Sequence, residues 1–515
     1  MQLGAAQLRR FKMGITAMGW GLIIFIATFV CIGIGMVAFV KGSGKRYIVC
    51  GKSLPFFFVG TMLMAQAVDA NTSLGAASLA YEIGFWEGFT VPLGLAGCLF
   101  ITALFYAKRL NKLNLLTLPD YYFRRYGSKM EVLTGMAMAL SFMILVAGNF
   151  SGSAWILTIV YDMDYLTALI LISVLIFVYT IAGGLFSCAA TDIVQLYPAI
   201  IGFVGCFVYL LASHGWDFFA EVIPPDYFDI AGMTSMERGS LINWATIASL
   251  ALGDVVALDF MERIYSARTG RTAQIACFYA AFWTVCTGFI CTMIGVMGMK
   301  LYPEIADSRM VLPTIAMEQV PYILGLLMVA GVIGAGASTA NGGILGISTT
   351  FGRNIFQKNI LRWIRESKGE KLMVHHSEEE RAKADARLLW ISRAMAVPAL
   401  IGAIWIAYVK PEPGTLLALA FDVVLAGCFV PLTLGLYWKK ANEVGALVGM
   451  IVGSIARIVM IYTTPEEWAG IETLTAPLFS LIMIPVSLMT QNSCPSKHHV
   501  NDEVPDDAEV LAGVC

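Results

Sequence analysis

The chain has 515 residues, of which 58% are apolar and only 14% are charged, and its net charge is −2. Soluble domains are roughly 45–50% apolar and about 25% charged, so this composition excludes an ordinary soluble enzyme or a nucleic-acid-binding protein. Apolar runs of about 20 residues recur along the whole length, and each can span about 30 Å of hydrocarbon as a helix. The sequence therefore predicts an all-α polytopic membrane protein.

The apolar runs predict about thirteen transmembrane helices. The first is too long for the apolar core of a cleaved signal peptide and lacks a clear cleavage site, so we expect it to be retained. In chain order the predicted spans are 15–40, 55–80, 89–107, 130–160, 164–183, 191–212, 241–262, 273–299, 322–351, 389–409, 414–437, 443–463 and 474–489.

The distribution of basic residues orients these spans. Most of the 34 Lys and Arg residues fall in loops on one side, which the positive-inside rule makes cytoplasmic. Because the number of spans is odd, we expect the N-terminus outside and the C-terminus in the cytoplasm, in a cell (plasma or inner) membrane. The basic cluster Arg9, Arg10 and Lys12 runs against this orientation.

The predicted soluble parts are small and leave no room for a catalytic domain. The loop 352–388 ends in "SEEERAKADAR", which we expect to form a short surface helix, and a polar tail occupies 491–515. The 11 Cys residues show no metal-ligand spacing, and the chain has neither a phosphate-binding loop nor a nucleophile elbow. The sequence predicts a protein that is not an enzyme and carries no cofactor.

Polar residues interrupt two of the predicted spans. Asp69 stands in "MAQAVDANTSLGAAS" in the second span, and Asp254 follows Gly253 in "SLALGDVVALDFMER" in the seventh. A charge at the centre of a bilayer costs roughly 2.5–3.5 kcal/mol on insertion scales. Something in the fold or the function must therefore offset that cost.

The two interrupted spans lie five spans apart. Inverted-repeat transporters place a broken helix in each half, with the binding site between the breaks. The alternative is a pair of kinks satisfied by neighbouring helices. The expected division is a leading helix and loop in 1–53, a 5+5 inverted-repeat core in 54–440 (repeats about 54–212 and 239–438), two trailing helices in 441–490, and the tail.

Four stretches resemble the sodium/solute symporter family, which includes proline, sugar, sialic acid and urea carriers. They are "LNLLTLPDYYFRRYG" at 113–127, "YTIAGGLFSCAATDIVQ" at 179–195, "DFMERIYSARTGRTA" at 259–273 and "GVIGAGASTANGGILGISTTFGRNIF" at 331–356. The resemblance runs from about 50 to 440. It implies the LeuT-type inverted-repeat fold and sodium as the coupling ion.

The resemblance also implies a sodium site at the first break. Sodium prefers oxygen ligands, and residues 335, 338 and 339 share one helical face. The hydroxyls of a Ser-Thr pair can instead bond to carbonyls of their own helix, and this alternative stays open. The implied ligands are the carbonyls of Ala67, Ala70 and Ala335 and the hydroxyls of Ser338 and Thr339, with the acidic Asp192 beside them.

The candidate substrate site is rich in carboxylates and amides. The sequence indicates no Arg or Lys in the core, because Arg457 lies in a trailing span, and this disfavours monocarboxylates and sialic acid. Asp259 and Glu262 also replace residues that are uncharged in many family members. The candidate residues are Gln66, Asp69, Asn71, Thr72, Asn149, Asp254, Asp259 and Asp422.

These residues predict a sodium-coupled secondary active symporter that imports a small polar solute by alternating access. A cationic, zwitterionic or neutral solute fits, such as an amino acid, a polyamine, a quaternary amine or urea. One alternative is a proton-coupled or uncoupled permease in which Asp192 or Asp254 titrates. Another is a transporter-like sensor working with a separate kinase. The expected partners are the solute, sodium and the bilayer, and the oligomeric state is not predicted.

Overall fold

The computed structural model describes residues 5–215, 228–305, 307–367 and 378–496. Within these ranges the chain forms helices and no β-strand, and an isolated backbone bridge joins Leu54 to Ala267. The predicted all-α fold is confirmed. Most of the predicted polar tail lies outside the described residues.

Many of the helices are interrupted by short 3₁₀- or π-helical segments. The α-helices are α1 (Ala5–Gly35), α2 (Val37–Val40), α3 (Gly44–Val49), α4 (Phe56–Ala67), α5 (Ala70–Glu82), α6 (Phe85–Ile101), α7 (Ala107–Lys112), α8 (Pro119–Tyr126), α9 (Ser128–Tyr161), α10 (Tyr165–Gly183), α11 (Leu185–His214), α13 (Ala231–Thr234), α14 (Ser240–Ala248), α15 (Leu258–Ser266), α16 (Gly270–Leu301), α17 (Val311–Glu318), α18 (Tyr322–Thr349), α19 (Leu361–Ser367), α20 (Glu378–Val409), α21 (Pro413–Val424), α22 (Val430–Tyr437), α23 (Glu443–Thr463), α24 (Ile471–Phe479) and α25 (Met483–Met489).

Eleven helices of the described residues are long and apolar enough to cross a membrane, or up to twelve if a bent pair is counted as one span. This count agrees roughly with the predicted thirteen. The predicted span 55–80 is not among them because it is divided into α4 and α5, of which α4 is a short apolar helix.

Both predicted interruptions are present. In the first, Val68 and the extended Asp69 (φ −100°, ψ 180°) separate α4 from α5. In the second, a π-helical segment (Ser249–Gly253) and a 3₁₀ turn (Asp254–Val256) follow α14, and the axis then bends by 49° into α15.

One predicted boundary differs from the structure. The sequence "SEEERAKADAR" does not form a separate surface helix, because from Glu378 onward it is the first part of α20, which continues to Val409. Three glutamates occupy the first turn of α20, where negative charge is favoured by the helix dipole. No glycine or proline follows until well inside the span, so nothing interrupts the helix.

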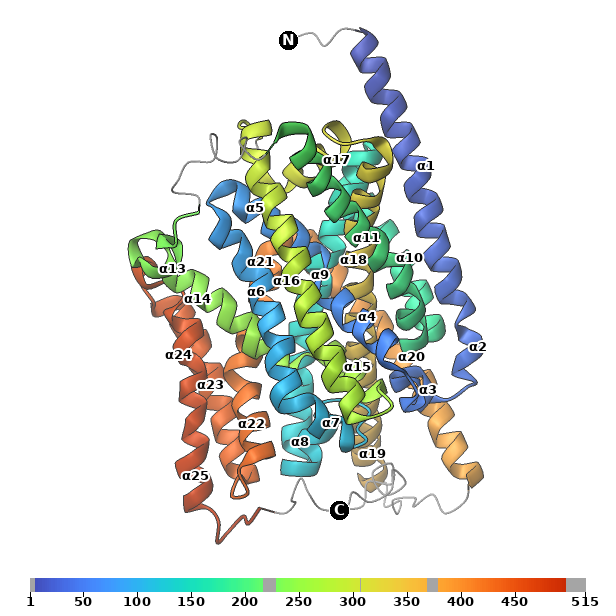
Figure 1. The fold of residues 1–515 in the computed structure, drawn as a ribbon. Helices are drawn as coiled ribbons and strands as arrows, with labels where there is room; N and C mark the ends of the chain where they lie inside the picture. Colours follow the sequence, from blue (N-terminus) through green and yellow to red (C-terminus); the bar gives the residue numbers. More distant parts are fainter. Residues whose placement is uncertain (1–4, 216–227, 306, 368–377, 497–515) are drawn as a thin grey trace.

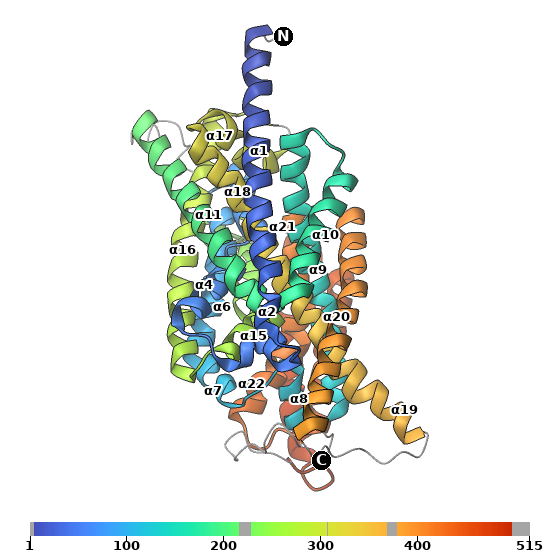
Figure 2. The ribbon, with the colours of Figure 1, turned by 90° about the vertical axis from the view of Figure 1, so that its right-hand side faces the viewer.

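α18 runs through the middle of the bundle and packs against α9 and α11 (Figures 1 and 2). Small residues permit this close approach: a Cβ added at Gly331 would lie 2.5 Å from Ala199 Cα of α11. The broken spans pack beside α18, since both α4 and α15 contact it. The two breaks are therefore held against one central helix.

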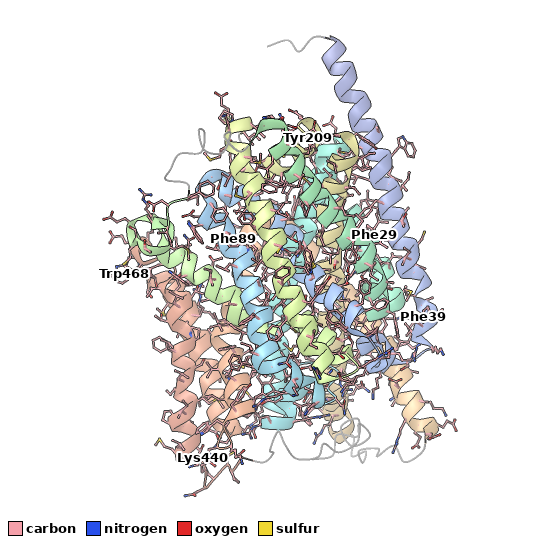
Figure 3. All side chains as sticks on the ribbon, viewed as in Figure 1. Phe29, Phe39, Phe89, Tyr209, Lys440 and Trp468 are labelled. Carbon is pink, nitrogen blue, oxygen red and sulfur yellow. The ribbon has the colours of Figure 1, made fainter. Side chains whose placement is uncertain are left out.

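The first and last helices lie on opposite flanks of the bundle (Figure 1). α1 packs on α10 and α11, where the buried Phe29, labelled in Figure 3, meets Tyr179 edge-to-face at 5.7 Å. α23, α24 and α25 pack together on the other flank, beside α14 and α21. We refer to the end of the bundle that carries α8 and α25 as the α8 end, and to the opposite end, which carries α17, as the α17 end (Figure 1).

Candidate functional site

Asp69 lies at the first break, and its side chain caps the start of α5. The carboxylate accepts hydrogen bonds from the Thr72 amide at 2.6 Å, from Asn71 Nδ2 at 3.0 Å and from Asn149 Nδ2 of α9 at 2.8 Å. A carboxylate at a helix N-terminus is also favoured by the helix dipole. The structure thus brings together four residues predicted for the substrate site. It also gives Asp69 enough donors to stay at this depth.

α18 meets the first break through its predicted ligand face. The Thr339 hydroxyl donates to the Gln66 carbonyl at 3.3 Å, and Gln66 Nε2 donates to the carbonyl and the hydroxyl of Ser338 at 2.9 and 3.1 Å. A Cβ added at Gly336 would lie 2.9 Å from Ala70 Cβ. Gln66, a predicted substrate-binding residue, therefore donates hydrogen bonds to Ser338, a predicted sodium ligand.

Asp192 of α11 completes this polar cluster. Its Oδ1 accepts a hydrogen bond from the Ser338 hydroxyl at 2.8 Å, and its Oδ2 lies 3.7 Å from Arg263 Nη2 of α15. Both charged side chains are fully buried. Gly342 leaves room for the guanidinium, because a Cβ there would lie 2.8 Å from Arg263 Nη2.

The expectation that the core holds no Arg or Lys is wrong, because Arg263 is in the core. The seventh span was predicted to end at 262, where charged residues begin, and this placed Arg263 in a loop. In the structure α15 continues to Ser266 with all of its residues buried. The available signal was the spacing from Asp259, one helical turn earlier, whose carbonyl accepts a hydrogen bond from Arg263 Nη1 at 3.1 Å.

Asp254 lies at the second break and is only 2% exposed. None of the residues that the structure describes donates a hydrogen bond to its carboxylate or forms an ion pair with it. A second buried acid, Asp259, follows five residues later in the first turn of α15. Asp254 is thus a buried acid near a second acid, and no described residue donates a hydrogen bond to it.

The other two acids of this region, Asp259 and Glu262 of α15, each have a donor. Asp259 Oδ1 accepts from the Phe260 amide at 2.7 Å, and Glu262 Oε1 accepts from the Thr349 hydroxyl of α18 at 2.6 Å. Both side chains are buried. The bond to Thr349 also ties α15 to α18 beyond the predicted sodium ligands.

Asp422 of α21 has a partner that the sequence did not indicate. It is ion-paired with Arg457 of α23, and its carboxylate also accepts hydrogen bonds from the hydroxyls of Ser249, at 2.9 Å, and Thr473, at 3.4 Å. Its charge is therefore compensated within the protein, unlike that of Asp254.

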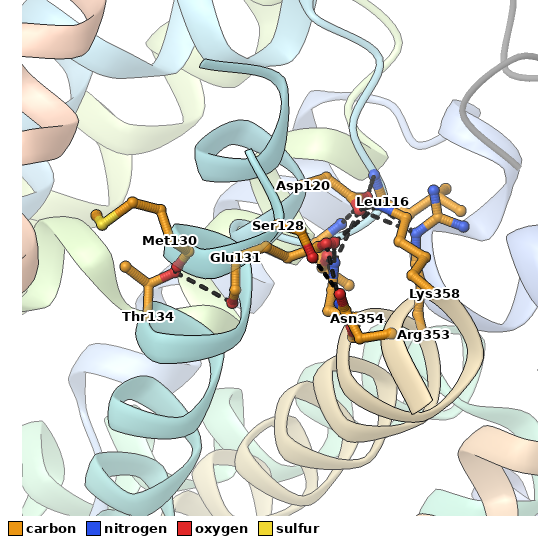
Figure 4. Close-up of polar contacts among 11 residues, drawn as sticks. Leu116, Asp120, Ser128, Met130, Glu131, Thr134, Arg353, Asn354 and Lys358 are labelled. Carbon is orange, nitrogen blue, oxygen red and sulfur yellow. Dashed lines mark hydrogen bonds and ion pairs between the residues drawn. The ribbon is translucent and has the colours of Figure 1, made fainter. Parts of the chain in front are cut away.

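A second charged cluster lies at the α8 end, outside the predicted site (Figure 4). Asp120 of α8 accepts hydrogen bonds from Arg353 Nε at 3.0 Å and Lys358 Nζ at 2.5 Å, and Lys358 also bonds to Glu131 of α9 at 2.9 Å. Burial alone would raise the pKa of Asp120, but the Arg353 guanidinium and the Lys358 ammonium hold it well below its usual range. The cluster joins α8 and α9 to the π-helical continuation of α18 at 350–360.

Comparison with known proteins supports the same reading. The chain is 23% identical to human high affinity choline transporter 1 over 456 residues, which cover 85% of this chain and 75% of that protein. It is 24% identical to the sodium/pantothenate symporter of Haemophilus influenzae over 455 residues, covering 84% of this chain and 88% of that protein.

Among solved structures, the chain resembles a Na⁺-coupled sialic acid symporter in its substrate-bound outward-open state. The TM-score is 0.76 at 18% identity, and the match covers 94% of this chain and 99% of that chain. The two proteins therefore share the LeuT-type fold. The two relatives named above are membrane transporters and not enzymes. Since the model of the sodium:solute symporter family matches residues 47–453, most of its length, the chain belongs to that family.

Proposed function

We propose that the protein imports a small organic cation by sodium-coupled symport and alternating access. The observation that carries the substrate class is Asp254, a buried carboxylate with no donor among the described residues. An unpaired buried charge is strongly unfavourable. A cationic group on the solute would supply the missing charge at the second break.

The rest of the charge distribution supports a cation over an anion. The buried Arg263 faces Asp192, and Arg457 is paired with Asp422, so both guanidinium groups already have carboxylate partners. An anionic solute would need a free cationic group, and it would also face Asp254. Choline, which one relative is named for, carries a fixed positive charge of the kind we propose.

The sodium ion is proposed to bind at the first break. The Ser338 hydroxyl donates its proton to Asp192 and accepts a hydrogen bond from Gln66 Nε2, so one lone pair of its oxygen remains for an ion. The five proposed ligands are oxygens, the donor type that hard cations prefer. They are the carbonyls of Ala67, Ala70 and Ala335 and the hydroxyls of Ser338 and Thr339.

Coupling follows if the ion and the solute favour the same conformation. Each ligand then raises the affinity of the other by the same factor. The two halves of the core would rock around the fixed breaks and expose them alternately to the two sides. We propose that the α8 end faces the cytoplasm and that α1 begins on the outside, as the basic loops predict.

A thermal-shift screen of the purified protein tests the substrate class. The melting temperature is measured with choline, polyamines, proline, glucose and pantothenate, each in sodium and in potassium at equal ionic strength. We expect cationic amines to stabilise the protein, and to do so more strongly in sodium. Stabilisation by pantothenate or glucose alone would overturn the cationic assignment.

Asp192→Asn should lower the apparent sodium affinity by about tenfold or more, the loss expected for one charge-assisted hydrogen bond of roughly 1.5–3 kcal/mol. Solute affinity at saturating sodium should change little. The side-chain partners of Asp192 are Ser338 and Arg263, and neither of them is predicted to bind the solute. The measurement is the sodium dependence of solute binding.

The single variant leaves Arg263 buried without its partner, which by itself destabilises the protein. The double variant Asp192→Asn/Arg263→Gln removes that charge and serves as the control. We expect it to regain thermal stability without regaining sodium affinity. A defect confined to solute affinity would instead place Asp192 in the solute site.

A further inference from the structure

Arg457 belongs to α23, a trailing helix that lies outside the two predicted repeats, and yet it is buried. Its guanidinium is ion-paired with Asp422 of α21, while its Nε and Nη1 have no hydrogen-bond partner within the described part of the chain. The same carboxylate accepts hydrogen bonds from Ser249 of the second broken span and Thr473 of α24. One charge pair thus joins four helical spans.

The contact with the broken span is made at Ser249, five residues before Asp254. Ser249 is the first residue of the π-helical segment that ends at Gly253, and its hydroxyl lies 2.9 Å from Asp422 Oδ1. At the other end of the segment, a Cβ added at Gly253 would lie 3.0 Å from both Cβ and the carbonyl oxygen of Phe421. α21 therefore touches this segment at both ends, through Asp422 and its neighbour.

The segment needs such support because π-helical geometry is rare and less favourable than the α-helix. Asp422 can hold Ser249 only while its side chain stays in place. The carboxylate lies among helices, where a compensating charge stabilises it. Among the described residues, Arg457 is the group that forms an ion pair with Asp422.

We infer that Arg457 is a positioning residue for the solute. The guanidinium of Arg457 compensates the negative charge of Asp422, and Asp422 accepts the hydrogen bond from Ser249. The π-helical segment that begins at Ser249 then fixes the position of Asp254. This inference rests on the proposed role of Asp254 and extends it: a trailing helix outside the repeats contributes to solute recognition. Arg457 itself does not touch the solute.

Solute and sodium affinities are measured on purified protein in proteoliposomes, with choline as the cationic probe. Arg457→Gln should raise the KM for choline by about tenfold or more, with Vmax changed by about twofold or less. The sodium affinity measured without solute should stay at the wild-type value, because the proposed ion site lies at the other break. Arg457→Lys keeps the charge and should recover most of the affinity.

Two further variants separate positioning from folding. Asp422→Asn/Arg457→Gln carries no unpaired charge, so it should fold normally and recover part of the lost affinity. Ser249→Ala removes the contact to the segment without changing charge, and should raise the KM for choline by about threefold. An unchanged KM in both Arg457→Gln and Ser249→Ala would overturn the inference.

A substrate-independent measurement keeps this test apart from that of the proposed function. The rate at which a small cationic thiosulfonate reagent modifies an Asp254→Cys variant is compared with and without Arg457→Gln, and each value is corrected for the parent lacking the new thiol. We expect the rate to change by about threefold or more. If the wild-type protein transports no cation, the proposed function fails. Independently of that result, a labelling rate that is the same with and without Arg457→Gln would overturn the positioning role of Arg457.

Discussion

Replacing both Ser338 and Thr339 with alanine should abolish sodium-driven uptake and leave the protein in the membrane. Each hydroxyl is a proposed ligand, and a contact between a hydroxyl and a charged partner contributes roughly 1.5–3 kcal/mol. Loss of both would weaken sodium binding by about 100-fold or more. The measurement is the initial rate of solute uptake as a function of sodium concentration.

The matched control is Ser348→Ala/Thr350→Ala, which removes the same two side-chain types from the end of α18 and the start of its π-helical continuation. The Ser348 hydroxyl donates to the Leu345 carbonyl of its own helix, and the Thr350 hydroxyl has no hydrogen-bond partner among the residues that the structure describes. This variant should keep its sodium dependence. Wild-type sodium dependence in Ser338→Ala/Thr339→Ala would mean that the ion binds elsewhere.

Asp254→Asn should cost a cationic solute roughly 2–5 kcal/mol of binding, the range for truncating one partner of a buried charge pair. That corresponds to an affinity loss of about 30-fold or more. A neutral solute should lose much less, because it does not depend on the carboxylate charge. The measurement is solute binding at saturating sodium from pH 5.5 to 8.

Asp164→Asn provides the control for Asp254→Asn. Asp164 caps α10 at the surface, where asparagine also caps well, so solute binding should not change. An unchanged affinity for a cationic solute in Asp254→Asn would refute charge selection. If the wild type binds in a pH-dependent way and Asp254→Asn does not, Asp254 is instead a proton site.

The two breaks could be predicted from the sequence because each combines small residues with an acid inside an apolar run. A polar group there must find a partner, and in an inverted-repeat fold the break itself supplies one. Asp69 shows this directly, since it caps the helix that the break creates. The resemblance to a family also pointed to Ser338 and Thr339, which do face the first break.

Arg263 shows where hydropathy fails. A span predicted from apolar content ends at the first cluster of charges, and "DFMER" at 259–263 is such a cluster. In the structure those charges are buried, because Asp192 and Thr349 on neighbouring helices provide partners. The end of a buried helix is therefore set by tertiary pairing, which one sequence does not reveal.

The pairs Asp422–Arg457 and Asp120–Arg353 could not be predicted for a related reason. Their members lie 35 and 233 positions apart and on different helices. No periodic pattern links such residues, and a single sequence carries no covariation. Asp422 was therefore predicted for the solute site without knowledge of its ion pair with Arg457.

Concentrative uptake under an imposed ion gradient tests sodium coupling most directly. Proteoliposomes are loaded with potassium, diluted into sodium or potassium buffer at the same pH, and supplied with the cation found in the thermal-shift screen. We expect transient accumulation above equilibrium only with the inward sodium gradient, and its loss when a sodium ionophore is added. Equal uptake in potassium, or accumulation driven by a proton gradient without sodium, would contradict sodium symport.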